Sequence, residues 1–256
     1  MKQKISAILL CAGFGTRLKP LTLKRPKPLL PVGGVPMLVF NLILLKEAGF
    51  KEVTLNLYHH GEAIEKLLQD GRALDIKIHY SWEKKILGTA GGVRQVLSYQ
   101  PASQFLVLNG DVLSDIPLKQ LIQLHQHSSA KASLVAIPSN KLQVSRYLYY
   151  QNKGKLLSIS QKAPHTPSKK GIFAGVQIIN RDLIETFPLN KKGCLVQNIY
   201  DPALARQDNL QVMEHQGFWE DLGSLEKLKA MDRAFYQKQV PDSMQRLYKK
   251  ARQLLF

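Results

Sequence analysis

Apolar strand patterns and helical patterns alternate over the first half of this 256-residue chain. Short strands are predicted at residues 5–10, 53–57, 76–80, 105–108 and 132–137. Helical patterns fill the intervals, at residues 36–48, 61–68, 91–97 and 117–127. Strands that are joined through helices pair in parallel, because each helix carries the chain back to the edge where the previous strand began. The pattern predicts an α/β fold, Rossmann-like, in which a mostly parallel, mixed sheet has helices on both faces.

The alternation changes after Pro138. Residues 144–150 and 156–160 flank the turn sequence Gln-Asn-Lys-Gly and predict a hairpin. Further elements are expected as a strand at 171–179 and helices at 181–187, 195–206 and 224–236. The second half therefore inserts an antiparallel hairpin region into the fold. We expect one domain over residues 1–236, made of halves 1–137 and 138–236.

Residues 237–256 differ from the rest and predict a basic C-terminal helical tail. Met244, Leu247, Leu254 and Leu255 form a partial apolar stripe among several Lys and Arg residues. Such a stripe favours a helix that packs on the body of the protein or on a second copy of it. A role at a membrane surface or on nucleic acid is the alternative.

Charge and cysteine content narrow the class of protein. The formal net charge of +17 suggests anionic partners, or else a generally basic surface. The two cysteines, Cys11 and Cys194, are too few for a disulfide framework and fit the cytoplasm. The apolar N-terminal run is short and leads directly into a basic loop, so we expect a core strand there and no membrane span.

The loop that follows the first strand is rich in glycine and in cations. Gly13 and Gly15 let the backbone come close to a ligand, and five cations follow within a dozen residues: Arg17, Lys19, Lys24, Arg25 and Lys27. Together these features suggest a polyphosphate site, most simply for a nucleoside triphosphate. The loop lacks the Gly-Lys-Ser or Gly-Lys-Thr of a P-loop, and Leu18 stands where the dinucleotide fingerprint needs its third glycine.

An aspartate follows another predicted strand end. Asp111 comes after the buried strand 105–108 and the pair Asn109-Gly110. The carboxyl ends of parallel strands meet at one edge of a sheet, so this carboxylate is expected near the glycine loop. It is well placed to hold a hard cation, while a turn or a helix cap is the structural alternative.

The run Gly13-Phe-Gly-Thr-Arg-Leu-Lys-Pro-Leu-Thr with Pro26-Lys-Pro-Leu-Leu-Pro-Val resembles the signature of the sugar-1-phosphate nucleotidyltransferases. Four further blocks fall in the order of that family: Leu87-Gly-Thr-Ala-Gly-Gly, Leu108-Asn-Gly-Asp, Phe173-Ala-Gly-Val and Trp219-Glu-Asp-Leu-Gly-Ser. The resemblance implies transfer of a nucleoside monophosphate from a nucleoside triphosphate to a sugar 1-phosphate, with Mg²⁺ as cofactor. It makes residues 1–137 the nucleotide half and 138–236 the sugar-phosphate half.

The resemblance also implies roles for single residues. Arg17 and Lys27 would be catalytic, with Arg17 on the leaving pyrophosphate and Lys27 at the α-phosphate. Asp111 and Asp221 would hold the metal. The nucleotide would contact Leu10, Ala12, Gly13, Gly15, Thr16, Arg17, Gly88, Thr89 and Ala90. The sugar phosphate would contact Asn109, Gly110, Lys162, Gly175 and Asn198. Gln161 replaces the Glu that usually precedes the lysine equivalent to Lys162.

The sequence does not decide which nucleotide and which sugar are the substrates, because it resembles two subgroups of this family. Leu87-Gly-Thr-Ala-Gly resembles guanylyltransferases and some thymidylyltransferases, and it favours guanylyl transfer to mannose 1-phosphate or a related sugar. The length of the chain and Asn56-Leu-Tyr-His-His equally resemble the N-acetylmuramate-1-phosphate uridylyltransferases. From a different class, a basic nucleic-acid-binding protein or a catalytically inactive regulatory protein is the alternative. We expect no nucleic-acid partner, and either a monomer or a homo-oligomer.

Overall fold

The computed structural model describes residues 5–138 and 144–255, so residues 1–4 and 139–143 of the expected domain and residue 256 of the expected tail lie outside the described residues. The chain divides into two compact units, each built from separate stretches of sequence. Unit 1 comprises residues 1–6, 87–107 and 117–216. Unit 2 comprises residues 7–86, 108–116 and 217–256. The expected halves, in contrast, were continuous stretches.

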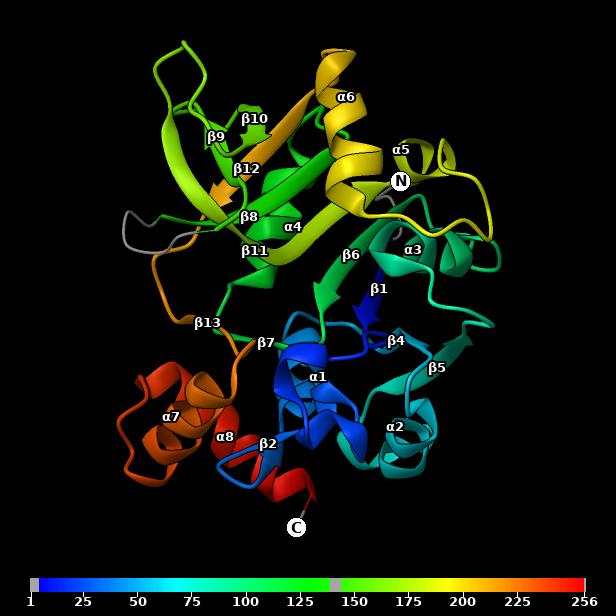
Figure 1. Cartoon of the computed structure of the whole chain (residues 1–256), viewed down its shortest axis with the longest axis vertical. Coiled ribbons are helices and arrows are strands. Elements are labelled where there is room, and N and C mark those ends of the chain that lie inside the picture. The colour runs from blue at the N-terminus through cyan, green and yellow to red at the C-terminus, as the bar shows by residue number, and fades with distance from the viewer. Residues whose placement is uncertain (1–4, 139–143, 256) are drawn as a thin grey trace. The chain divides into compact units, whose positions relative to one another are not determined.

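Unit 2 contains parallel strands β1 (Ile5–Leu10, shared with unit 1), β4 (Glu52–Leu57) and β5 (Lys77–Trp82) (Figure 1). Helices α1 (Met37–Glu47) and α2 (Gly61–Leu68) connect these strands, as the alternation predicts. Every residue of α1 from Met37 to Leu45 is buried, which suits a helix that is apolar on all sides.

Short elements complete unit 2. The basic loop forms three 3₁₀ turns, η1 (Thr16–Leu18), η2 (Leu21–Leu23) and η3 (Lys27–Leu29). Another 3₁₀ turn is η4 (Arg72–Leu74). Two antiparallel pairs follow, β2 (Pro31–Val32) with β3 (Val35–Pro36), and β7 (Val112–Ser114) with β13 (Trp219–Asp221). The chain ends with helices α7 (Leu225–Tyr236) and α8 (Asp242–Leu255).

Helix α8 packs against unit 2 along the apolar stripe of the basic tail. Met244, Leu247 and Ala251 are buried, and α8 contacts α1. Arg246 Nη1 and Lys250 Nζ each lie 2.5 Å from Glu47 Oε1 at the end of α1. Partial burial raises the pKa of Glu47, but hydrogen bonds and charge from Arg246 and Lys250 outweigh it, so the pKa is lowered. Two of the basic residues of the tail are thus paired with Glu47 of the same chain.

Unit 1 contains the antiparallel region. Strand β11 (Lys169–Asn180) pairs antiparallel with β8 (Ala132–Pro138) and β9 (Tyr147–Tyr150), and β9 with β10 (Leu156–Ser160), which is the expected hairpin. Strand β12 (Leu210–Glu214) is parallel to β8. Strand β6 (Gln104–Asn109) runs from unit 1 into unit 2. The remaining elements are α3 (Gly88–Leu97), α4 (Leu118–Gln126), α5 (Arg181–Glu185), a π-helical turn η5 (Val196–Tyr200) and α6 (Asp201–Ala205).

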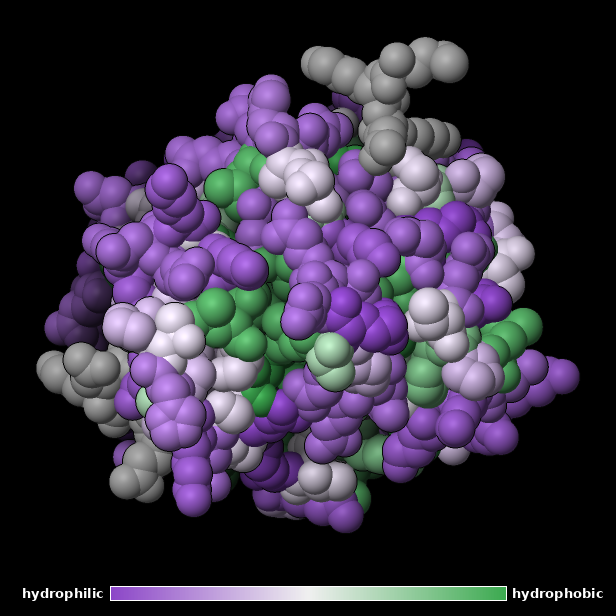
Figure 2. Space-filling view, turned by 90° about the horizontal axis from the view of Figure 1, so that it is seen from above, coloured by the Kyte–Doolittle hydropathy of each residue, from purple (hydrophilic) through white to green (hydrophobic). Residues whose placement is uncertain are grey.

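The expected mixed α/β class is confirmed, with parallel strands and connecting helices in unit 2 and antiparallel segments in unit 1. Hydrophilic side chains dominate the face shown in Figure 2, with apolar side chains in patches between them. Within the described residues, no helix is both long and apolar enough to cross a membrane.

A buried histidine in unit 1 is held by two hydrogen bonds. Because Asn180 Oδ1 can only accept, His125 Nε2 donates to it over 3.0 Å, and His125 Nδ1 lies 2.7 Å from Ser133 Oγ. Burial lowers the pKa of His125 below its ordinary value of 6.5, and the hydrogen bond to Asn180 opposes this only in part. The folded state therefore favours the neutral ring.

We expect the free energy of unfolding to decrease as the pH falls below about 6.5, because the unfolded chain then binds a proton that folded His125 resists. The contribution of one such group is at most about 1.4 kcal/mol per pH unit. Thermal unfolding followed by circular dichroism between about pH 7.5 and pH 5 measures this slope. The His125→Gln variant should show a shallower slope. An equal slope in both proteins would rule out His125 as the cause.

Candidate active site

The strand ends of unit 2 are fixed by buried polar groups. The Cys11 N–H, directly after β1, donates to Asn56 Oδ1 at the end of β4 over 2.8 Å. Asn56 Nδ2 donates to Glu83 Oε1, just beyond β5, also over 2.8 Å. Asn56 and Glu83 are buried. This chain of hydrogen bonds holds the start of the glycine loop in place, and no sequence motif points to Glu83.

The glycine loop is closed on one side and open on the other. Gly15 has φ 61°, and a Cβ there would lie 2.8 Å from Thr22 Cγ2 and 3.0 Å from Lys27 Cβ. Thr22 Oγ1 donates to the Gly15 carbonyl over 3.0 Å. A Cβ on Gly13, in contrast, would meet no atom within 4 Å. The packed side explains why glycine is needed at position 15, and the open side leaves room for a ligand beside Gly13.

Two adjacent histidines hold the 3₁₀ turn η2. His59 Nε2 donates to the Thr22 carbonyl over 3.2 Å, and His60 Nε2 donates to the Leu23 carbonyl over 3.0 Å, because a carbonyl oxygen can only accept. These contacts tie the middle of the basic loop to the segment after β4. The sequence offered no signal for this, since the partners are backbone atoms of a distant segment.

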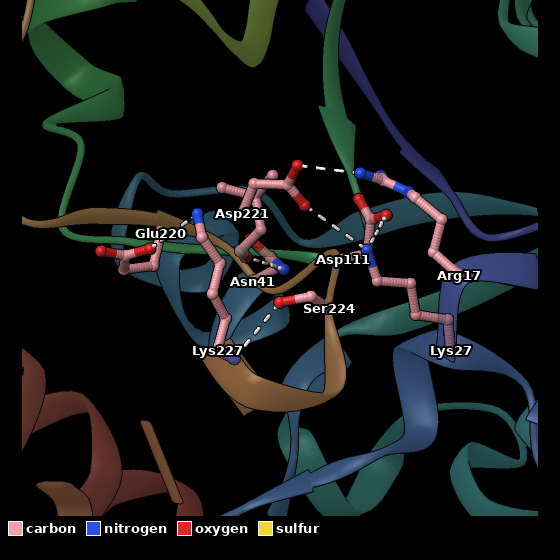
Figure 3. A network of polar contacts seen from close by, with 9 residues as sticks. Arg17, Lys27, Asn41, Asp111, Glu220, Asp221, Ser224 and Lys227 are labelled. Atoms are coloured by element: carbon pink, nitrogen blue, oxygen red, sulfur yellow. Dashed lines mark hydrogen bonds and ion pairs between the residues drawn. The ribbon is translucent and has the colours of Figure 1, made fainter. Parts of the chain in front are cut away.

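Lys27 lies at the centre of a charged cluster (Figure 3). It opens η3 between Pro26 and Pro28 and is only 6% exposed. Lys27 Nζ lies 2.6 Å from Asp111 Oδ2 and 3.5 Å from Asp221 Oδ1. A buried ammonium held by two carboxylates is fixed in position, which distinguishes Lys27 from the exposed cations of the same loop.

Two strand segments bring the carboxylates together. The Gly110 N–H donates to the Leu10 carbonyl over 2.9 Å, so the residue before Asp111 is joined to the end of β1. A Cβ on Gly110 would lie 2.8 Å from that carbonyl oxygen. In the β7–β13 pair, Asp221 is opposite Val112, the residue after Asp111. The expectation that the ends of the two strands meet is therefore confirmed.

Arg17 completes the cluster from the exposed side. Its Nη2 lies 3.9 Å from Asp221 Oδ2, and 72% of its side chain is exposed. A Cβ on Gly223 would lie 2.8 Å from Arg17 Nη1, so this glycine leaves space for the guanidinium. Glu220 instead pairs with Lys227 Nζ at 3.5 Å, on the other side of the strand, as the alternation of side chains predicts (Figure 3).

The residues expected around the nucleotide base lie in unit 1. Gly88, Thr89 and Ala90 form the first turn of α3, three residues earlier than the predicted start of this helix. Each contacts a neighbouring segment: the Ala90 N–H donates to the Gly193 carbonyl, and Thr89 Oγ1 accepts from the Leu195 N–H. A Cβ on Gly88, whose φ is 68°, would lie 2.4 Å from the Gly193 oxygen. Packing within unit 1 therefore accounts for the glycine at position 88.

Three of the sugar-phosphate candidates, Lys162, Gly175 and Asn198, also lie in unit 1, whereas Asn109, the last residue of β6, lies in unit 2. Lys162 is exposed, and its carbonyl accepts from Ser160 Oγ over 2.6 Å. Gly175 has φ 75° where the register of β11 against β8 shifts. Asn198 lies in η5, and its Oδ1 accepts from the Cys194 N–H over 2.8 Å. The predicted residues that the structure brings together in unit 2 are Arg17, Lys27, Asp111 and Asp221, with Gly110 joined to β1.

We expect Cys11 to resist alkylation although it lies beside the charged cluster. Its side chain is 2% exposed, and burial together with the charge of Asp111 raises the pKa of the thiol. Cys194 is partly exposed. Iodoacetamide at about pH 8 should therefore label Cys194 first and Cys11 only after unfolding, which peptide mass spectrometry measures. Equal labelling rates in the native protein would contradict the buried position of Cys11.

A family model matches this chain over most of its length. The family model described as "Nucleotidyl transferase" matches residues 6–238. This chain belongs to the nucleotidyl transferase family. The expected resemblance is thereby confirmed at the level of the family, whose members are enzymes.

Two kinds of curated relative of this nucleotidyl transferase stand out. The "Mannose-1-phosphate guanylyltransferase catalytic subunit beta" of Drosophila pseudoobscura pseudoobscura is 34% identical over 221 residues, which are 85% of this chain and 58% of the relative. The "N-acetylmuramate alpha-1-phosphate uridylyltransferase" of Neisseria meningitidis is 35% identical over 231 residues, which are 88% of this chain and 96% of the relative. The chain thus spans less than two thirds of the guanylyltransferase relative.

Solved structures support the same fold. HddC from Yersinia pseudotuberculosis, solved with GMP-PN, aligns with a TM-score of 0.75 and 22% identity over 90% of this chain and 99% of HddC. A putative glucose-1-phosphate thymidylyltransferase from Bacillus anthracis aligns with a TM-score of 0.77 and 19% identity over 90% of this chain and 94% of its own. At these identities the likeness establishes the fold of the nucleotidyl transferase and not its substrates.

Proposed function

We propose that the protein transfers a nucleoside monophosphate from a nucleoside triphosphate to a sugar 1-phosphate, which gives a nucleoside diphosphate sugar and pyrophosphate. The single observation that carries this proposal is the convergence of Lys27 and Arg17 with Asp111 and Asp221 beside the open glycine loop. A phosphate oxygen of the sugar 1-phosphate attacks the α-phosphorus, the bond to the β-phosphate oxygen breaks, and the electron pair leaves with pyrophosphate.

Charge neutralisation is the main requirement of such a reaction, because the attacking group and the leaving group are both anions. Lys27, fixed between two prolines, supplies positive charge at the α-phosphate. Arg17, exposed at the open side of the cluster, binds the β- and γ-phosphates and then the leaving pyrophosphate. The N–H groups near Gly13 bind the triphosphate at the open side of the loop. No covalent intermediate on the protein is needed.

The carboxylates fit a divalent metal. Asp111 and Asp221 direct oxygen atoms at one point, which the Lys27 ammonium approaches in this structure. Mg²⁺ takes oxygen ligands and commonly uses one or two carboxylates together with water and substrate phosphates. Among residues 5–138 and 144–255, no group of three or more His, Cys, Asp or Glu side chains could hold a metal ion. Together with water and substrate phosphates, Asp111 and Asp221 would hold Mg²⁺, which supplies positive charge to the phosphates.

Guanylyl transfer to mannose 1-phosphate is the leading proposal for the substrates. It is supported by the names of several relatives and by the block that begins at Leu87. Uridylyl transfer to N-acetylmuramate 1-phosphate is the second proposal, which is favoured by the relative that the chain matches over 96% of its length. Gly88, Thr89 and Ala90 are proposed to contact the base. Asn109, Lys162, Gly175 and Asn198 are proposed to contact the sugar phosphate.

A substrate matrix tests the proposal. ATP, GTP, CTP, UTP and dTTP are each combined with mannose 1-phosphate, N-acetylmuramate 1-phosphate and glucose 1-phosphate in the presence of Mg²⁺, and pyrophosphate is measured. We expect pyrophosphate with GTP and mannose 1-phosphate, or with UTP and N-acetylmuramate 1-phosphate. Pyrophosphate release that does not depend on a sugar 1-phosphate, or no release from any pair, would contradict the proposed reaction.

A further inference from the structure

Unit 2 contains a groove beside the basic loop that the proposed reaction does not use. Its volume of about 660 Å³ is in the range of small-molecule sites. The groove lies between residues 20–31 and the start of α7. Its apolar lining is formed by Pro20, Leu21, Leu30, Pro31, Leu225 and Leu228. Leu21 is 40% exposed, so part of this apolar lining is open to solvent.

The charged residues that line the groove are three cations and one carboxylate. Lys24, Arg25 and Lys229 line it, are exposed, and form no ion pair with any other described residue. Asp232 also lines the groove, where its Oδ1 accepts from the Gly33 N–H over 2.7 Å, so the lining keeps an excess of positive charge, with three cations against one carboxylate. An apolar groove with three unpaired cations is complementary to an anion that has an apolar body.

Both walls of the groove are formed by segments that are close in sequence to residues of the charged cluster. On one wall, Lys24 and Arg25 stand three and two residues before Lys27. On the other wall, Leu225 follows Asp221 by four residues and opens α7, with Ser224 as its N-cap. A ligand that touches both walls therefore contacts the two segments that carry the candidate catalytic residues.

We propose that this groove is an effector site for a small anion with an apolar body, of the alkyl phosphate class. The phosphate pairs with Lys24, Arg25 and Lys229, and the alkyl chain covers the leucine and proline side chains. Its binding restrains the basic loop relative to α7 and so changes the affinity for the nucleotide. The binding itself is independent of the proposed function, whereas the effect on nucleotide affinity rests on it.

Isothermal titration calorimetry with octyl phosphate tests the binding, with octanol and inorganic phosphate as comparison ligands. We expect octyl phosphate to bind one site at least about tenfold more tightly than either comparison ligand, because it alone offers both the charge and the chain. Equal binding of octanol or of phosphate, or no saturable binding up to about 1 mM, would overturn the proposal.

Variants locate the site. Lys229→Glu reverses one unpaired charge, and Leu225→Asp places a charge on the apolar lining, so each should weaken octyl phosphate binding by about tenfold or more. Lys66→Glu is the matched control, because Lys66 is an exposed lysine on α2 outside the groove, and its binding should equal that of the wild type. Wild-type affinity in Lys229→Glu, or an equal loss in Lys66→Glu, would show that octyl phosphate binds elsewhere.

Nucleotide titrations test the effector role. Saturating octyl phosphate should change the dissociation constant of the nucleotide by about fivefold or more, and the nucleotide should change that of octyl phosphate by the same factor. An unchanged nucleotide affinity would overturn the effector role. If no nucleotide binds under any condition, the proposed function fails, while the calorimetric result for the groove still stands.

Discussion

Replacing Lys27 by alanine is expected to lower kcat for pyrophosphate release by about 10²- to 10³-fold. The ammonium of Lys27 is buried and lies within 3.5 Å of both Asp111 and Asp221, so two carboxylates fix its position. The variant loses the fixed positive charge that offsets repulsion between the attacking and leaving phosphates. Steady-state kinetics with the most active substrate pair measure the effect.

Lys24→Ala is the matched control for Lys27→Ala. Lys24 is an exposed lysine three residues earlier in the same loop and makes no ion pair among the described residues. Its loss should leave kcat close to that of the wild type. Lys27→Arg, which keeps the charge, should restore part of the activity, and thermal unfolding shows whether each variant is folded. An equal loss in Lys24→Ala and Lys27→Ala would contradict the special role of Lys27.

Asp111→Asn and Asp221→Asn should each lower kcat/KM by about 10²-fold or more, because each removes half of the negative charge available to a divalent cation. The amide keeps nearly the same shape, so the packing of β7 against β13 is retained. Mn²⁺ binding, followed by electron paramagnetic resonance, should weaken in both variants. The double variant should lose little more activity than either single variant, since the two residues act on one cation.

Glu220→Gln provides the control for Asp221→Asn. Glu220 is the adjacent residue on β13, but it pairs with Lys227 rather than with Lys27. Activity and Mn²⁺ affinity should both stay near the wild-type values. Comparable losses in Glu220→Gln and Asp221→Asn, or unchanged Mn²⁺ binding in both aspartate variants, would contradict the assignment of the metal ligands.

Most strands and helices could be predicted from local sequence patterns. Strand β1 has the predicted bounds, and α1 is one residue shorter at each end, because apolar runs and helix-ending glycines are local signals. The short pairs β2–β3 and β7–β13 were not predicted, since two or three residues carry too little pattern. The expected helix 195–206 is instead the π-helical turn η5 followed by α6. Such a change in hydrogen bonding leaves no mark in apolar spacing.

The residues of the candidate site also fall into those that could be predicted from the sequence and those that could not. Arg17, Lys27, Asp111 and Asp221 were found from motifs, and the structure brings their charged groups into one cluster. The residues that support this cluster could not be predicted, because their roles depend on tertiary contacts. Glu83 orients Asn56, and the space above Gly223 admits Arg17. Neither interaction could be inferred without knowing which distant segments meet.

The fate of labelled phosphorus tests the central claim most directly. The nucleotide that gives the most pyrophosphate in the substrate matrix is prepared with radioactive phosphorus at either the α- or the γ-position and is incubated with its sugar 1-phosphate. We predict that the α-label appears in the nucleoside diphosphate sugar and the γ-label appears in pyrophosphate, in equal amounts and only when both substrates are present. Transfer of the γ-label to the sugar, or release of the α-label as free nucleoside monophosphate, would contradict nucleotidyl transfer at the α-phosphorus.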